Sequence, residues 1–164
     1  MSKILIVSDT HGRNGLLKEV INKEKPFDLL VHCGDAECSE GNLIALADTP
    51  VYVVEGNNDY FYDLSRRIEF DYGGRHFLVT HGHYDKVYYG LDNLTYRALE
   101  CNANFVLFGH THVPCIKDID GVTYINPGSL THPRQTGHEP TYVTLKLIDE
   151  KKHKIELKKC TKVL

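Results

Sequence analysis

Three short apolar segments in the first third of the chain alternate with two segments that have helical periodicity. The apolar segments are 4–7, 28–33 and 51–54, and the helical ones between them are 14–25 and 40–47. Strand–helix–strand units of this kind form parallel sheets with right-handed crossovers. Ligands bind such sheets outside the carboxyl ends of the strands. The pattern therefore predicts an α/β fold whose binding site lies where these strands end.

The second part of the chain reads as a series of hairpins with one further helix and strand. Gly73-Gly74 and Asp120-Gly121 are strong signals for tight turns between extended segments. The predicted hairpins pair 67–72 with 76–80, 115–118 with 122–125, and 141–148 with 153–159. A helix over 91–101 leads to an apolar strand over 104–108. Antiparallel strands are thus expected beside the parallel ones.

Length and composition indicate one ordinary globular domain over residues 1–164. A chain of 164 residues is long enough for one core and too short for two domains of common size. Hydrophobic residues make up 41% and charged residues 25%, which is typical of globular proteins. The net charge of -3 gives no broad basic field, so a nucleic-acid polymer is disfavoured as a partner.

The first residues and the cysteines indicate the cellular compartment in which the protein is expected. The apolar run 4–7 is too short for a signal-peptide core or a membrane span, so we expect a cytoplasmic protein without membrane attachment. The five cysteines are odd in number and lack C-x-x-C spacing, which argues against disulfides and against a zinc site made of cysteines. They are interpreted as reduced thiols.

Polar side chains follow five of the predicted strands, at the point where each strand ends. In chain order they are Asp9, His11, Asp35, Asn57, His81, His110 and His112. Each residue also has a simpler interpretation when it is taken alone. The two aspartates could be helix N-caps, and the asparagine could occupy a turn conformation with positive φ. The histidines could be ordinary loop residues. A metal site explains all five strand ends at once. Imidazole and carboxylate without thiolate suit Mn²⁺, Fe²⁺, Zn²⁺, Co²⁺ or Ni²⁺ better than Ca²⁺ or Mg²⁺.

These residues divide into two sets that could share one carboxylate. Asp9, His11 and His112 could bind one ion with one oxygen of Asp35, and Asn57, His81 and His110 a second ion with its other oxygen. A bridging carboxylate holds two ions about 3.5–4 Å apart, as in two-metal hydrolytic sites. The histidine pair in Gly109-His110-Thr111-His112 would then serve both ions, and the glycine is expected to let the chain turn sharply after its strand.

The ordered motifs resemble those of the calcineurin-like metallophosphoesterases, in particular the small single-domain phosphodiesterase branch of bacteria and archaea. The matching motifs are Asp9-Thr10-His11, His32-Cys33-Gly34-Asp35, Gly56-Asn57-Asn58-Asp59, Thr80-His81-Gly82-His83, Gly109-His110-Thr111-His112 and Asn126-Pro127-Gly128-Ser129. The resemblance spans roughly residues 3 to 134. It implies a four-layer αββα sandwich, the metallo-dependent phosphatase fold, in which two mixed β-sheets are flanked by helices.

The resemblance also implies a reaction and its cofactors. It implies two divalent transition-metal ions, with Mn²⁺ as the first choice and Ni²⁺, Fe²⁺, Co²⁺ or Zn²⁺ as alternatives. It implies hydrolysis of a phosphate ester by a hydroxide that bridges the ions, and a small phosphodiester or nucleotide-like compound as the substrate. In the family, the Asn-Pro-Gly-Ser loop borders the site.

Three further residues are candidates for contact with the substrate. Many relatives have a histidine directly after the asparagine ligand, where this chain has Asn58, which can donate a hydrogen bond but cannot transfer a proton. His83 is then a candidate general acid or a residue that supports ligand His81. Arg134 could clamp a phosphate or could be a solvated loop residue.

Three other functions compete with the phosphodiesterase. The first is a non-catalytic protein-binding scaffold, because the fold also resembles that of a retromer subunit. Such scaffolds tend to lose their metal ligands, whereas all seven are present here. A phosphomonoesterase is a closer alternative, and a nuclease would need a basic groove. Tyr84, Tyr88 and Tyr89 could line a substrate cleft, pack in the core or form a homo-oligomer contact.

Overall fold

The first of two five-stranded sheets contains the amino-terminal strands of the protein. In this computed structural model, which describes residues 1–160, the strand order is β10-β9-β1-β2-β3. The strands are β1 Ser2–Val7, β2 Leu29–His32, β3 Val51–Val53, β9 Thr141–Leu147 and β10 His153–Lys159. The first three run parallel to one another, while β9 and β10 are antiparallel additions at the edge next to β1. The predicted last hairpin thus completes the sheet that the first strand begins.

The second sheet is also mixed, in the order β4-β5-β6-β8-β7. Its strands are β4 Arg67–Tyr72, β5 Arg75–Thr80, β6 Phe105–Leu107, β7 Cys115–Ile119 and β8 Val122–Asn126. The helices are α1 Asn14–Glu24, α2 Glu40–Ala47 and α3 Asp92–Cys101, with a short 3-10 helix η1 over Val87–Tyr89. Strands β5, β6 and β8 are parallel, and the outer strands are antiparallel hairpin partners.

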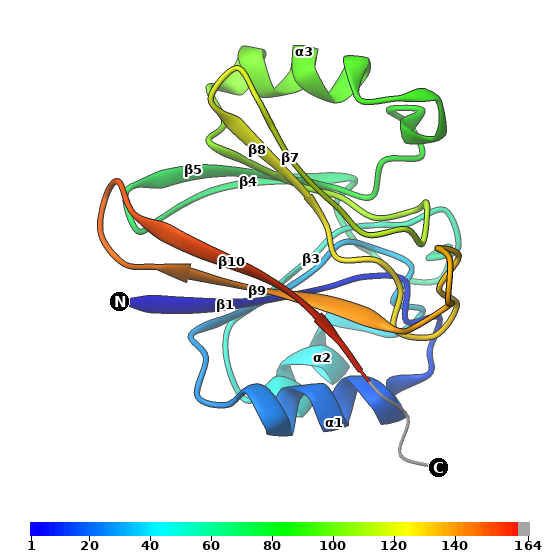
Figure 1. Ribbon diagram of the computed structural model, residues 1–164. Helices are drawn as coiled ribbons and strands as arrows, with labels where there is room; N and C mark the ends of the chain where they lie inside the picture. Colours follow the sequence, from blue (N-terminus) through cyan, green and yellow to red (C-terminus); the bar gives the residue numbers. More distant parts are fainter. Residues whose placement is uncertain (161–164) are drawn as a thin grey trace.

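The two sheets stack face to face, with α1 and α2 beneath one and α3 above the other (Figure 1). Three aromatic rings, Phe70, Phe77 and Phe105, form a continuous stack between the sheets, with successive centroids 4.9 Å apart. Separate apolar clusters join the helices to the outer faces of the sheets. The predicted four-layer αββα sandwich is confirmed. One domain over 1–164 stays a prediction, and residues 161–164 lie outside the described residues.

Glu24 is a buried carboxylate that joins the end of α1 to the first sheet. It accepts hydrogen bonds from Lys3 Nζ at 2.8 Å, from the Tyr142 hydroxyl at 2.7 Å and from Lys158 Nζ at 3.0 Å. Burial raises the pKa of this carboxyl, but these three donors outweigh burial and lower the pKa to about 2. The ionised form of Glu24 therefore stabilises the folded state.

Replacing Glu24 with Gln is expected to lower the free energy of unfolding at pH 7 by about 3 kcal/mol, because the pKa difference between unfolded and folded states is lost. The native contribution is fully present above the ordinary pKa of 4.5 and disappears as the pH falls towards about 2. Urea denaturation across that pH range measures both effects. Glu19→Gln, on the exposed face of the same helix, is the control. An equal destabilisation of Glu24→Gln at pH 2 and pH 7 would contradict the assignment.

Candidate metal centre

The seven predicted ligands lie together at one pole of the sandwich, in the loops at the carboxyl ends of β1, β2, β3, β5 and β6 (Figure 1). His112 Nε2 lies 3.1 Å from Asp9 Oδ1 and 3.3 Å from His11 Nε2. Together they form the first of the two predicted sets. The structure therefore brings residues about one hundred positions apart in the chain to a single point.

The second predicted set meets at the side-chain oxygen of Asn57. His81 Nε2 and His110 Nδ1 each lie 3.1 Å from Asn57 Oδ1. Asp35 stands between the two sets, with its Oδ2 atom 3.4 Å from His81 Nε2 and 3.9 Å from His11 Nε2. From the sequence we predicted that each ion would bind a different oxygen of Asp35. In the structure Oδ2 is the oxygen that lies close to both sets.

The ring nitrogens that face away from the site identify the tautomers of three histidines. His11 Nδ1 lies 2.7 Å from Glu37 Oε2, His81 Nδ1 lies 2.7 Å from the Cys33 carbonyl, and His112 Nδ1 lies 2.7 Å from the His132 carbonyl. Carboxylate and carbonyl oxygens only accept hydrogen bonds, so each Nδ1 donates. In the neutral imidazole, Nε2 then presents a lone pair towards the site, as metal-bound histidines do.

The inward-facing atoms Asp9 Oδ1, His11 Nε2 and His112 Nε2 are consequently acceptors that face one another without a donor between them. Asp9 Oδ1 is buried and has no hydrogen-bond partner among the described residues. Its close neighbour His112 Nε2 is an acceptor in the neutral ring, so their contact at 3.1 Å is not a hydrogen bond. Buried acceptors of this kind are costly unless a cation lies between them. The chemistry of the donor set therefore fits divalent metal ions.

The pKa values of Asp35 and His81 shift in opposite directions because each charged form stabilises the other. Burial raises the pKa of Asp35, but His81 and the amide groups of Asn58 outweigh burial and hold it well below its usual range. Burial lowers the pKa of His81, but Asp35 and Asp9 outweigh burial and raise it. For His110, burial and the charge of His81 lower the pKa to about 4. The two carboxylates thus favour positive charge at His81, whereas His110 is held in its neutral form.

Backbone strain is concentrated in the predicted ligands. Five of the seven have φ values in the left-handed region, between 48° and 72°. They are Asp9, His11, Asp35, His110 and His112. A non-glycine residue held in a sparsely populated region of this kind costs of the order of 1 kcal/mol, and such residues cluster at functional sites. Asn57 lies in a turn but does not have a positive φ, so the positive φ considered for it is wrong.

The N-cap interpretation of the aspartates is also wrong. Helix α1 has Arg13 at its N-cap and helix α2 has Ser39, whose hydroxyl accepts from the Asn42 amide. Asp9 and Asp35 lie several residues before these positions, in the loops that follow β1 and β2. Their side chains are therefore free to face the centre.

Gly56 and Gly109 allow the backbone to approach the two aspartates closely. A Cβ atom on Gly56 would overlap the carboxylate and amide nitrogen of Asp35, and one on Gly109 would overlap Ser8 Oγ and Asp9 Oδ2. The sequence suggested that Gly109 serves a sharp turn. Its φ is not in the left-handed region, so close packing is the reason for this glycine.

The sequence did not predict the roles of two residues that support the ligands. Asp59 is fully buried, and its carboxylate accepts from the backbone amides of Asp35, Gly56 and Glu37. Ser8 Oγ donates to Asp9 Oδ2 at 2.5 Å. Asp59 belongs to a motif that was recognised, but only its bonds to the distant amides of Asp35 and Glu37 show what it does.

His32, in the motif that ends with Asp35, supports the centre through hydrogen bonds rather than as a ligand. The Gly34 amide donates to His32 Nδ1 at 3.2 Å, so Nε2 donates to Thr10 Oγ1, 2.8 Å away. Burial lowers the pKa of His32 to about 4. The ring is neutral at pH 7 and braces the loops that carry Asp9 and Asp35.

The turn predicted at Asn126-Pro127-Gly128-Ser129 borders the centre. Asn126 Nδ2 donates to the Gly109 carbonyl and to Thr111 Oγ1, both at 3.0 Å. Ser129 Oγ donates to the Asp9 carbonyl at 2.8 Å. These contacts hold the strained loops in place, a role the sequence did not indicate.

The three candidate substrate residues lie at the rim of the centre. Asn58 Nδ2 donates to Asp35 Oδ2 at 2.9 Å, so its amide is engaged with the aspartate. His83 lies with its ring centroid 5.3 Å from that of His81, and its Nδ1 is buried without a hydrogen-bond partner among the described residues. Arg134 donates to the Tyr88 hydroxyl, which itself donates to the His110 carbonyl. Their roles in binding or catalysis stay predictions.

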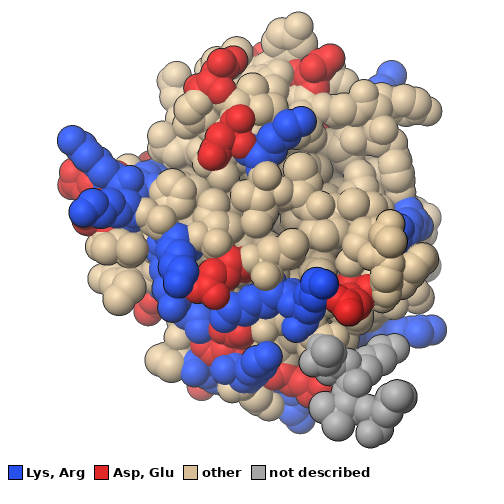
Figure 2. Space-filling view, in the orientation of Figure 1, with Lys and Arg blue, Asp and Glu red and all other residues tan. Residues whose placement is uncertain are grey.

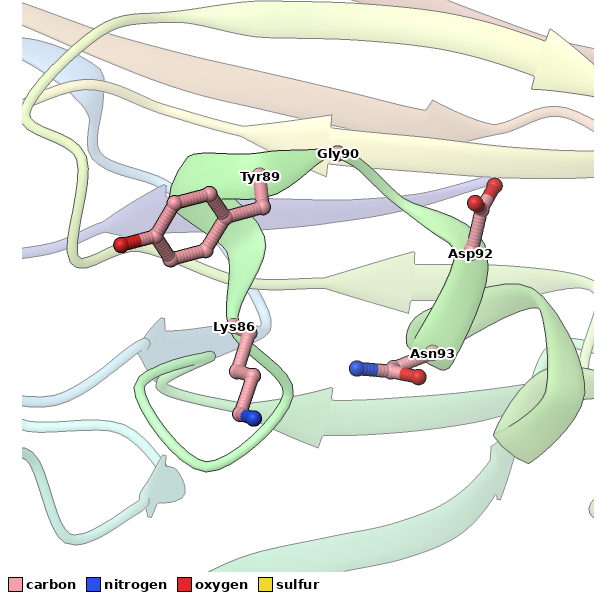
Figure 3. Close-up of a pocket in the computed structure, with 5 residues that line it drawn as sticks. All are labelled: Lys86, Tyr89, Gly90, Asp92 and Asn93. Atoms are coloured by element: carbon pink, nitrogen blue, oxygen red, sulfur yellow. The ribbon is translucent and has the colours of Figure 1, made fainter.

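A surface hollow of about 580 Å³ lies away from the ligands, beside η1 and the start of α3. Its lining residues are Lys86, Tyr89, Gly90, Asp92 and Asn93 (Figure 3). None of the seven predicted ligands lines it, and Tyr89 is 91% exposed. Tyr89 is therefore not a core residue, one of the three roles considered for it.

Residues 2–150 match the model of the calcineurin-like phosphoesterase superfamily domain. The chain belongs to this superfamily. It is 38% identical over 132 residues to the probable metallophosphoesterase YsnB of Bacillus subtilis, covering 80% of this chain and 76% of that one. A crystal structure of a predicted phosphoesterase from Streptococcus pneumoniae superposes with a TM-score of 0.85 at 30% identity, over 96% of this chain and 89% of the other.

The Vps29 structures share the fold at lower identity. Wild-type Vps29 of Entamoeba histolytica, complexed with Zn²⁺, superposes with a TM-score of 0.75 at 18% identity and covers 96% of this chain and 98% of that one. This likeness concerns the fold alone.

Membership of the family establishes a hydrolase of phosphate esters that uses divalent metal ions. The described residues contain candidate ligand clusters for such ions at the pole of the sandwich. Among residues 1–160, none of the helices has the length and apolar character needed to cross a bilayer.

Proposed function

We propose that this chain is a dinuclear metal-dependent phosphodiesterase that acts on a small phosphodiester or nucleotide-like substrate. The observation that carries the proposal is the convergence of the other six candidate ligands around Asp35, with buried Asp9 Oδ1 left without a hydrogen-bond partner among the described residues. Asp9, His11 and His112 would hold one ion, Asn57, His81 and His110 the other, and Asp35 both. Two bound ions supply Lewis acidity, which activates water as the nucleophile and offsets charge on the phosphoryl oxygens.

The residues of the chain supply orientation. Glu37 and the carbonyls of Cys33 and His132 fix three imidazole rings, and Asp59 fixes the backbone of Asp35. Because these partners hold the ligands before substrate arrives, little reorganisation is needed at the moment of reaction.

His83 is proposed to hold the proton that the leaving group takes up. Its ring centroid lies 5.3 Å from that of His81, and its buried Nδ1 is left without a protein partner in the described part of the chain. Arg134 would orient a phosphoryl oxygen. In support, its exposed side chain donates to the Tyr88 hydroxyl, which donates to the backbone carbonyl of His110. Asn58 would offer a hydrogen bond to the same group after leaving Asp35.

The preference for a diester is proposed from Asn58 and from the character of the surface. Asn58 cannot transfer a proton, which weakens the case for a monoesterase that relies on a histidine at this position. Figure 2 shows lysines and arginines interspersed with acidic residues over one face. Lys158 pairs with Glu24, and Lys159 pairs with Glu139. A small substrate fits this mixed surface better than a nucleic-acid polymer does.

Removal of the metals is expected to abolish hydrolysis of a bis-aryl phosphodiester, and Mn²⁺ is expected to restore it. The measurement compares chelated protein, chelated protein with Mn²⁺, and Mn²⁺ alone, with an aryl diester and the corresponding aryl monoester as substrates. A higher kcat/KM for the diester supports the proposal, and faster hydrolysis of the monoester favours the phosphomonoesterase. Protein that binds metal but hydrolyses neither ester would indicate a scaffold.

A further inference from the structure

A second group of side chains of the types that bind metals lies at the second sheet, away from the candidate metal centre. Glu69 in β4, His76 in β5 and Cys101 at the end of α3 offer ligand atoms that all lie within 4.8 Å of one another. His76 is near the beginning of β5, whereas His81 follows the end of the same strand. The two groups are therefore separated by the length of that strand.

The sheet register places this group on the face that α3 covers. Asp71 is the direct cross-strand partner of His76, and Glu69 precedes Asp71 by two positions, so the three side chains share one face. Leu78, two positions after His76, packs in the cluster beneath α3. The last residue of α3, Cys101, meets the hairpin at this point.

The contacts of His76 orient its ring for metal binding. Its Nε2 lies 3.0 Å from Glu69 Oε1, and its Nδ1 lies 2.7 Å from Asp71 Oδ1. A carboxylate that binds the outer nitrogen of a histidine, while the other nitrogen faces the ligand position, is the arrangement found around protein-bound zinc. Asp71 would keep that role, and Glu69 would share the ion with the ring.

We propose that Glu69, His76 and Cys101 form a binding site for a single Zn²⁺-type ion, completed by water. One thiolate, one imidazole and one carboxylate are the ligand types that zinc binds at about 2.0–2.3 Å, which puts ligand atoms roughly 3.3–3.8 Å apart. The side chains of Glu69 and His76 are exposed or half-buried and can close the remaining distance. Cys101 is a free thiol that donates a hydrogen bond to the Ala98 carbonyl at 3.7 Å. It would release its proton to solvent when the ion binds.

The ion would fasten the carboxyl end of α3 to the β4–β5 hairpin, beside the hydrogen bonds that already join Asn104 to His76. Its ligand set differs from that of the candidate metal centre in containing sulfur. Thiolate favours Zn²⁺ and Co²⁺ over Mn²⁺, so the two places are expected to select different metals. The inference does not depend on the proposed phosphodiesterase function.

Cobalt titration of the full-length protein tests the site, because a thiolate bound to Co²⁺ gives an intense near-ultraviolet charge-transfer band that imidazole and carboxylate ligands do not give. The wild-type protein should develop this band, and Cys101→Ser should lose it together with one equivalent of bound Zn²⁺. Cys115→Ser, which removes a half-buried thiol outside the group, should keep both. Absence of the band from the wild type, or its persistence in Cys101→Ser, would overturn the proposal.

A second variant tests the site without changing any of the three proposed ligands. Asp71→Asn leaves all three proposed ligands in place and removes only the carboxylate behind His76. Loss of such a partner lowers metal affinity by about 10-fold or more. The band should therefore appear at correspondingly higher Co²⁺ concentration, and an unchanged titration curve for Asp71→Asn would contradict the placement of His76 among the ligands.

Discussion

Asp35→Asn is expected to reduce phosphodiesterase activity by about 1,000-fold or more and to lower the metal content of the protein. The Oδ2 atom of Asp35 lies 3.4 Å from His81 Nε2 and 3.9 Å from His11 Nε2, so it is the atom shared by the two predicted ligand sets. Asparagine keeps the volume of the side chain but removes the charge and one acceptor. Loss of a single preorganised electrostatic group commonly costs 100- to 1,000-fold, and this group would serve two ions.

Metal analysis and steady-state kinetics with saturating Mn²⁺ measure the two effects separately. Asp63→Asn is the matched control, because Asp63 is an exposed aspartate away from the predicted ligands. Circular dichroism and thermal unfolding verify that both variants are folded. Full activity of Asp35→Asn with unchanged metal content would refute the proposed function.

The order and type of the elements could be predicted from the sequence because local signals determine them. The strand and helix boundaries differ from expectation by only one or two residues at most ends, as at Val53 and Asp92. Short η1 was missed, since three residues carry too little periodicity to predict a helix. The placement of β9 beside β1 depends on pairing between opposite ends of the chain, which a local pattern does not encode.

The candidate site could be located from residue type and position, but not its internal geometry. Asp9 and His110 were found because carboxylates and imidazoles follow buried strands. Their left-handed backbone conformations were not found, since such strain is stable only where surrounding contacts impose it. The same holds for Asp59 and Ser8, whose roles rest on partners that the fold brings together.

Gly109→Ala is expected to lower activity by about 100-fold or more while the protein remains folded. The added methyl group would overlap Ser8 Oγ and Asp9 Oδ2, so the buried carboxylate must move away from its position beside His112. Displacement of a preorganised group by even 1 Å can cost about 100-fold in rate. Kinetics and metal content, measured with saturating Mn²⁺, report the change.

Two further variants separate this effect from a general loss of stability. Gly15→Ala adds the same methyl group in α1, where it meets no atom within 4 Å, and should leave activity unchanged while stabilising the helix by about 0.5–1 kcal/mol. The double variant Ser8→Ala with Gly109→Ala removes the hydroxyl that the methyl group overlaps and should recover part of the lost activity. Because Asp9 Oδ2 still opposes the methyl group, recovery should be incomplete. Wild-type activity in Gly109→Ala would show that the close approach of this loop to Asp9 is not needed for the reaction.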